Sequence, residues 1–187
     1  MKKVLVVVDV QKDFYHPNGA LYVEGGELLP ERIKKILPEY DKVIFTVDWH
    51  PLNHCSFVEN GGQWPKHCIA FTEGASLPNE FTDYIEIYEP LTKRFYMNVV
   101  SKGSLYDKEE YGVHHNALLT GYNTDEIKTF DVTVVGIHAL YCVKETLKEL
   151  LNANCNSLSI IPECIAPLNN EELIQFCNEN NINVISK

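Results

Sequence analysis

Basic residues are scarce in this sequence, and they form no cluster. The 187 residues include 16 lysines and arginines against 26 aspartates and glutamates, so the formal net charge is −10 at pH 7. Phosphate backbones and anionic lipid headgroups carry charge of the same sign and are repelled by such a protein. Nucleic acid and membrane surfaces are therefore not expected partners, and a small neutral molecule fits better.

Long hydrophobic runs are also missing. No segment approaches the roughly 20 apolar residues that a membrane-spanning helix needs. The first residues resemble the start of an export signal, but Asp9 interrupts the apolar run that begins at Val4. The six cysteines include no Cys-x-x-Cys pair, and without an export signal we expect free thiols rather than disulfides. These features predict a cytoplasmic protein.

The sequence has no repeat, linker or low-complexity tract, and its length predicts a single domain over residues 1–187. Strands are predicted at residues 4–8, 43–47, 85–88, 132–137, 157–161 and 183–185, and helices at 27–37 and 141–153. Nearly continuous apolar strands joined by helices predict an α/β fold with three layers, αβα, around a doubly wound, mainly parallel sheet of five or six strands. Residues 15–26 and 51–80 are predicted to be functional loops.

A carboxylate and imidazoles gather after the second predicted strand. Asp48 and His50 end an apolar run, and the period of two along a strand places both side chains on the same side. His67 follows in the next loop. Oxygen and imidazole donors without thiolate suit zinc, iron or manganese, and three protein ligands leave positions open for water or substrate. The spacing alone is equally compatible with polar residues at a loop edge.

A second group of residues could carry nucleophilic chemistry. Cys142 lies at a strand-to-helix junction, where backbone N–H groups and the helix dipole lower the pKa of a thiol. Asp9 ends the first predicted strand and could accept the thiol proton, while Lys102 could stabilise both charges. Taken singly, these residues are a small buried side chain, a turn former and a solvated lysine, so only their combination points to catalysis.

The motifs that carry these residues resemble a known family. They are DVQKDF at 9–14, DWHPLNHCSF at 48–57, GGQWPKHC at 61–68, SKG at 101–103 and GIHALYCV at 136–143. In this order and over nearly the whole chain, they resemble the nicotinamidase/pyrazinamidase family of isochorismatase-like cysteine hydrolases. The segments with the candidate metal ligands are the specific part, because many relatives keep an Asp-Lys-Cys triad without a metal site.

The resemblance assigns roles to individual residues. It implies Asp9, Lys102 and Cys142 as the catalytic triad, and the backbone N–H groups of His138 and Cys142 as the oxyanion site. It implies Asp48, His50 and His67 as ligands of one divalent metal ion, zinc before iron or manganese. Further residues implied are His54, as a fourth ligand or a neighbour of the metal, and Phe14 and Trp64, as aromatic contacts of the substrate.

The implied reaction is the hydrolysis of nicotinamide to nicotinate and ammonia through a thioester, with pyrazinamide as a second substrate and a role in NAD salvage. A homo-oligomer is also compatible with the sequence. Two alternatives stay open, namely another amide or carbamoyl hydrolase of the superfamily and a weakly active, ligand-binding relative. A structural zinc module is disfavoured because the sequence has no four-ligand Cys/His set of known spacing.

The sequence departs from the family beside the nucleophile. Where the family commonly has Ala-Thr-Asp before Tyr-Cys-Val, this chain has His138, Ala139 and Leu140. The triad is unaffected, but local hydrogen bonding, pocket volume and substrate preference are open to change. We expect Leu140 to pack against apolar neighbours and the ring of His138 to point away from the site.

Overall fold

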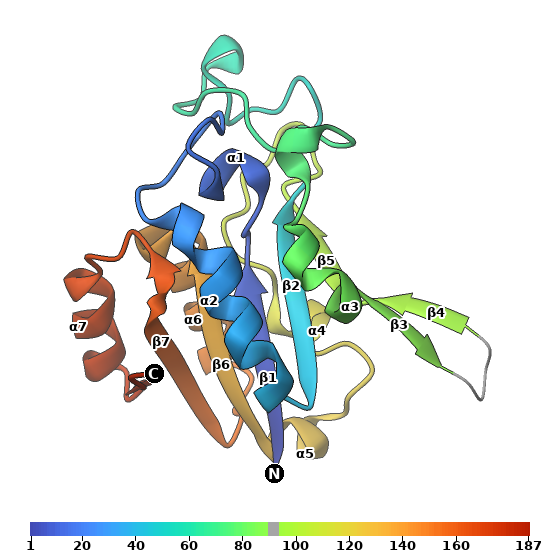
Figure 1. The fold of residues 1–187 in the computed structure, drawn as a ribbon, viewed down its shortest axis with the longest axis vertical. Helices are drawn as coiled ribbons and strands as arrows, with labels where there is room; N and C mark the ends of the chain where they lie inside the picture. Colours follow the sequence, from blue (N-terminus) through green and yellow to red (C-terminus); the bar gives the residue numbers. More distant parts are fainter. Residues whose placement is uncertain (90–93) are drawn as a thin grey trace.

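The computed structural model describes residues 1–89 and 94–187. Its main sheet has six parallel strands in the order β5-β2-β1-β6-β7-β8, with helices in front of and behind it (Figure 1). The strands of this sheet are β1 (Lys2–Val8), β2 (Lys42–Asp48), β5 (Val99–Lys102), β6 (Phe130–Ile137), β7 (Ser157–Ala166) and β8 (Asn183–Val184). The prediction of a doubly wound α/β fold is confirmed.

The sheet is parallel because its central strands are apolar on both faces. Val4 to Val8 of β1 are all fully buried, and Val132, Val134 and Val135 of β6 are buried beside them. Strands that are hidden on both faces need helices above and below. One cluster of buried apolar side chains runs through both layers, which accounts for the near absence of polar residues in these strands.

Two amphipathic helices illustrate how the faces are covered. In α2 (Leu29–Ile36), Pro30 lies in the first turn and Leu29, Ile33 and Ile36 are buried. In α6 (Lys144–Leu151), Leu147 and Leu150 face the core. Figure 1 shows α2 and α3 in front of the sheet and α4 and α6 behind it.

Of the other helical segments, only α7 has more than four or five residues. The sequence analysis did not predict this helix. These segments are α1 (Lys12–Tyr15), α3 (Thr82–Ile85), α4 (His115–Leu118), α5 (Thr124–Ile127) and α7 (Glu171–Glu179), with 3-10 turns at Gly26–Leu28, Leu37–Glu39, Val58–Asn60, Glu73–Ala75 and Asn79–Phe81 and a π-helical turn at Ala139–Val143. No helix in the described ranges is long and apolar enough to cross a membrane.

One predicted strand does not belong to the main sheet. The segment predicted at 85–88 corresponds to β3 (Glu86–Glu89), which pairs antiparallel with β4 (Arg94–Met97) in a separate ribbon that projects from the body of the molecule (Figure 1). The sheet position is taken by β5, which pairs with β2. Each of β3 and β5 has only four residues, two of them apolar, and periodicity alone cannot tell which of them joins the main sheet.

The topology brings the candidate site residues to one edge of the sheet. Asp9 follows β1, Asp48 ends β2, Lys102 ends β5, and Cys142 lies just beyond β6. Because all these strands are parallel, their carboxyl ends meet at the same edge, where α/β proteins bind ligands. In the register of β2 and β5, Asp48 is directly opposite Lys102. The loop over residues 51–80 and α1 lie above this edge (Figure 1).

Candidate functional site

A buried lysine lies at the centre of the candidate site. The Lys102 side chain is only 2% exposed, and its Nζ lies 2.8 Å from Asp9 Oδ2. It also forms an ion pair with Asp48 Oδ1 and lies 3.5 Å from Cys142 Sγ. The other oxygen of Asp9 accepts a hydrogen bond of 2.6 Å from Thr46 Oγ1. Three residues that are far apart in the sequence therefore surround one ammonium group.

Burial and charge set the ionisation of this group. Burial opposes the charge on Lys102, but Asp48 and Asp9 outweigh it and raise the pKa of the ammonium well above its usual value. The same ammonium and His50 keep the pKa of the Asp48 carboxyl low in spite of burial. Burial raises the pKa of the Asp9 carboxyl, an effect that Lys102 opposes and Asp48 reinforces. The carboxylate of Asp9 is thus a stronger base than an exposed one.

The thiol behaves differently from the prediction. Burial raises the pKa of Cys142 well above its usual value, with Lys102 opposing and the two nearby carboxylates reinforcing the shift. The sequence analysis expected a lowered pKa from a position at a helix start. The sulfur is enclosed beside Asp9 and Asp48, and both burial and nearby negative charge disfavour a thiolate. A base is needed to remove the proton.

Two histidines face Asp48 with fixed tautomers. The Nδ1–H of His50 donates to the carbonyl oxygen of Gly103 at 2.9 Å, and the Nδ1–H of His67 donates to that of Pro65 at 2.8 Å. A carbonyl can only accept, so each ring carries a proton on Nδ1 and turns its Nε2 toward Asp48. These Nε2 atoms lie 3.6 Å and 3.9 Å from Asp48 Oδ2.

The donor set fits a metal ion. Ligand atoms of Asp48, His50 and His67 all lie within 4.8 Å of one another, and all three residues are buried. A backbone carbonyl that fixes the outer nitrogen of a histidine is the usual support of a metal-binding imidazole. Burial also lowers the pKa of His67, which favours the neutral ring that a metal requires. These residues could therefore hold one transition metal ion.

His54 is close to this group but is oriented differently. Its Nε2–H donates to the carbonyl oxygen of Lys108 at 3.0 Å, and its Nδ1 accepts from Ser56 Oγ at 2.7 Å. Although its ring nitrogens lie within reach of His50 and Glu109, both are already engaged. The ring stacks on His50 with centroids 4.1 Å apart. Of the two roles predicted for His54, the geometry supports that of a neighbour which holds a ligand in place.

Gln11 is a site residue that the sequence analysis did not single out. Its fully buried side-chain amide forms two hydrogen bonds with the backbone of Asp48. Oε1 accepts from the Asp48 N–H at 2.7 Å, and Nε2 donates to the Asp48 carbonyl oxygen at 2.8 Å. The amide nitrogen also donates to the carbonyl of Ala75 at 3.0 Å. A polar residue three positions after a buried strand was the available signal.

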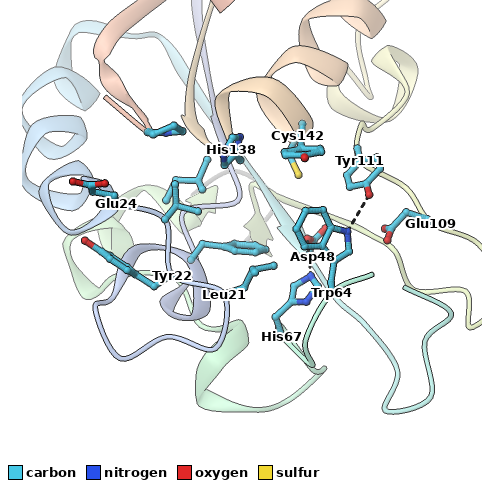
Figure 2. Close-up of a pocket in the computed structure, with 15 residues that line it drawn as sticks. Leu21, Tyr22, Glu24, Asp48, Trp64, His67, Glu109, Tyr111, His138 and Cys142 are labelled. Carbon is cyan, nitrogen blue, oxygen red and sulfur yellow. Dashed lines mark hydrogen bonds and ion pairs between the residues drawn. The ribbon is translucent and has the colours of Figure 1, made fainter. Parts of the chain in front are cut away.

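A cavity of about 420 Å³ opens over these groups (Figure 2). Its lining includes Cys142, Asp48 and His67 as well as the predicted aromatic residues Phe14 and Trp64. Further lining residues, absent from the predictions, are Leu21, Tyr22, Val23, Glu24, Glu109, Tyr111, Ile137, Tyr141 and Pro167. The Trp64 Nε1–H donates to the hydroxyl of Tyr111 at 3.0 Å, which fixes the indole ring at the wall.

The turn that holds Cys142 begins at His138. The carbonyl oxygen of His138 accepts from the N–H groups of Tyr141 and Val143, each at 3.1 Å. His138 and Cys142 both line the cavity (Figure 2). The ring of His138 is held against its own turn, because its Nδ1 accepts a hydrogen bond from the Leu140 N–H at 3.2 Å. The expectation that the ring points away from the site stays a prediction.

Several known proteins are similar to this chain in sequence and in fold. No protein-family model matches the chain. The nicotinamidase of Acinetobacter baylyi is 32% identical over 179 residues, which cover 87% of this chain and 80% of that protein. The nicotinamidase of Saccharomyces cerevisiae is 29% identical over 99% of this chain and 100% of its own.

Solved structures agree. The structure of yeast nicotinamidase bound to the inhibitor nicotinaldehyde has a TM-score of 0.78 at 27% identity, covering 99% of this chain and all of that chain. The pyrazinamidase of Pyrococcus horikoshii in complex with zinc has a TM-score of 0.73 at 27% identity, with complete coverage of both chains. The fold class is that of an isochorismatase-like hydrolase of Alkaliphilus metalliredigens, with a TM-score of 0.72 at 18% identity over 98% of this chain and 94% of that chain. Within that class, the chain belongs to the nicotinamidase family, which confirms the resemblance seen in its sequence.

Proposed function

We propose that the protein hydrolyses nicotinamide to nicotinate and ammonia, with pyrazinamide as a second substrate. The observation that carries the proposal is that the buried group of Cys142, Asp9 and Lys102 adjoins the cluster of Asp48, His50 and His67. One cavity is lined by Cys142 of the first group and by Asp48 and His67 of the second. Similarity to nicotinamidases and to a pyrazinamidase supports this choice among amides.

In the first half of the reaction, Asp9 takes the proton of the Cys142 thiol, and Sγ bonds to the carboxamide carbon. The C=O π pair moves to the oxygen, where the N–H groups of His138 and Cys142 bind the oxyanion. Loss of one such donor typically lowers the rate by about 10² to 10³. When the tetrahedral intermediate collapses, the C–N bond breaks and ammonia leaves with the proton from Asp9.

In the second half, Asp9 takes a proton from water, whose oxygen attacks the thioester carbon. The C–S bond then breaks and the proton on Asp9 returns to the sulfur. The product leaves as nicotinic acid, which loses its remaining proton to solvent and becomes nicotinate. Lys102 stabilises the charge on Asp9 and on the thiolate in both halves, because its Nζ is within 3.5 Å of Sγ. This role explains why an ammonium group is kept buried at the centre of the site.

Asp48, His50 and His67 would hold one divalent ion, for which zinc suits the donors better than iron or manganese. When bound, the ion would supply a Lewis acid beside the cavity that helps to position the pyridine ring for attack. Phe14 and Trp64 would flank the ring. Phe14 is buried and lies 5.4 Å from the His67 ring, and Trp64 is fixed by Tyr111, so both present apolar surface to a flat substrate.

Ammonia release from nicotinamide, with and without a metal chelator, tests the proposal. We expect turnover that the chelator lowers and added zinc restores. A matched Cys142→Ala variant should give no thioester and no ammonia. Release from other amides but not from nicotinamide would favour a different amide or carbamoyl hydrolase. Binding of nicotinamide without turnover would favour a ligand-binding relative.

The physiological setting follows from the same chemistry. Return of nicotinamide to nicotinate would serve NAD salvage, and the whole of residues 1–187 would act as one catalytic domain. The small-molecule partner agrees with the ligands of similar structures, which are nicotinate in one and nicotinaldehyde in the other. The cytoplasmic location and the homo-oligomer stay predictions.

A further inference from the structure

The imidazole of His138 closes the turn that carries the nucleophile. Its Nδ1 accepts a hydrogen bond from the backbone N–H of Leu140 at 3.2 Å, and its carbonyl oxygen accepts from Tyr141 and Val143. The N–H groups on either side of Cys142 are thus bonded to one oxygen of His138. A single residue therefore holds both the start and the far end of the turn.

The bond from Leu140 requires a neutral ring. An imidazole that accepts at Nδ1 has its proton on Nε2, and a protonated ring is a donor at both nitrogens. Burial lowers the pKa of His138, which favours this neutral form. The titratable groups that line the cavity with it come from several elements: Tyr141 and Cys142 from its own turn, Tyr22 and Glu24 from the loop before α2, Asp48 from β2, and His67, Glu109 and Tyr111 from later loops. The Tyr141 ring is nearest, with centroids 5.0 Å apart.

The neighbouring side chains in the turn cannot supply this bond. Ala139 and Leu140 have no acceptor, although the family pattern commonly has Thr and Asp at these positions. Compared with the family pattern, this chain lacks hydrogen-bond acceptor side chains at positions 139 and 140 and has one at position 138 instead. At the N-cap of a helical turn, an acceptor side chain typically stabilises by about 0.5–2 kcal/mol.

We propose that His138 is a positioning residue, whose imidazole caps the nucleophile turn and thereby keeps the backbone N–H of Cys142 aimed at the oxyanion. The proposal rests on the proposed hydrolysis of nicotinamide. It concerns the placement of a donor in the transition state, so it affects kcat more than KM.

Two variants separate the cap from other roles of the ring. His138→Ala removes the acceptor, whereas His138→Asn retains one, because asparagine is among the preferred N-cap residues. For His138→Ala we expect kcat to fall about tenfold, the factor that corresponds to ~1.4 kcal/mol, with KM little changed. His138→Asn should restore most of kcat. Metal content and thermal unfolding of each variant serve as controls for the rest of the site.

The pH profile gives an independent readout. In the wild type, protonation of His138 converts the acceptor into a donor, so kcat should fall on the acid side. The asparagine does not titrate, and the fall due to His138 should be absent from His138→Asn. Nitrogen NMR of the His138 ring should show the neutral Nε2–H tautomer at neutral pH.

Three results would overturn the proposal: a His138→Ala enzyme with the wild-type kcat, a His138→Asn enzyme as slow as His138→Ala, or an Nδ1–H tautomer. Its failure is distinguishable from that of the proposed function. If wild-type protein turns over nicotinamide and the variants behave otherwise than expected, only the cap is wrong. If wild-type protein releases no ammonia from nicotinamide, the proposed function fails, whereas the NMR result still decides whether the cap exists.

Discussion

Two groups of side chains lie beside the cavity, and these two walls are held in place in different ways; Cys142 of one wall and His67 of the other line the cavity itself. On one wall, Asp9, Lys102 and Cys142 hold one another by charge, and burial makes each ionisation depend on the others. On the other wall, the rings of His50 and His67 are each oriented by a backbone carbonyl. Loss of one member should therefore change the ionisation of its neighbours on the first wall but leave the remaining partners correctly aimed on the second.

Asp48 connects the two walls. One of its oxygens pairs with Lys102, and the other faces the histidine nitrogens. Its backbone is held separately by Gln11. The walls are thus independent in how they are positioned, but they share one charge. The following variants test how far this independence extends.

The largest effect is expected from Cys142→Ala, which removes the nucleophile and leaves the metal wall intact. Turnover of nicotinamide should fall by about 10⁴-fold or more, because the covalent route is lost. Metal content, measured by elemental analysis, should not change. Cys155→Ala is the control, since this partly exposed thiol lies outside the site, and it should keep its activity. If Cys142→Ala also lost its metal, the walls would not be independent.

The second variant removes a ring from the other wall. For His67→Ala we expect metal affinity to fall more than about 100-fold, because the loss of a ligand should exceed the 10–100-fold that is typical for a supporting residue. Turnover should fall with the metal, while Cys142 should still react with an alkylating agent. The exposed His114 serves as the control in His114→Ala, which should bind metal normally. Unchanged metal content in His67→Ala would contradict the assigned ligand set.

A smaller effect is expected from Gln11→Ala, which acts on the residue that both walls share. The variant leaves the buried N–H and carbonyl of Asp48 without their partner, which typically costs ~1–3 kcal/mol for each group. We expect a lower free energy of unfolding in denaturant and a metal affinity reduced about 10-fold. Gln175→Ala on α7 is the matched control. Normal stability together with normal metal binding would show that Asp48 is held by its ion pair alone.

The smallest effect on rate is expected from Leu140→Asp. Leu140 is half-buried and packs against the core, so a carboxylate there should lower the free energy of unfolding by ~1–3 kcal/mol. Activity on nicotinamide should change less than stability. The measurements are denaturant unfolding and kcat, with Leu140→Asn as the uncharged control. A Leu140→Asp enzyme that folds normally and is much faster would mean that the native chain has lost a working part.

Local sequence signals were sufficient for part of this architecture. The strands β1, β2 and β6 have strong apolar runs, and Asp9, Asp48 and Cys142 directly follow or end them, so their meeting at one edge could be predicted. Which of β3 and β5 joins the main sheet could not be predicted, because it depends on pairing with a strand that is distant in sequence. The roles of Gln11 and Tyr111 were missed for the same reason, since their partners are far away in sequence.

The edge strand β5 has a consequence for how the protein loses activity. This four-residue strand pairs only with β2 among the described strands, yet it ends in Lys102 and is followed by Gly103, whose carbonyl orients His50. Short peripheral strands open at a lower free energy than the centre of a sheet. Detachment of β5 alone would disable both walls while the core stays folded. Heat or mild denaturant should therefore abolish activity before the protein unfolds globally. Amide hydrogen exchange in β5 should increase in parallel with this loss of activity.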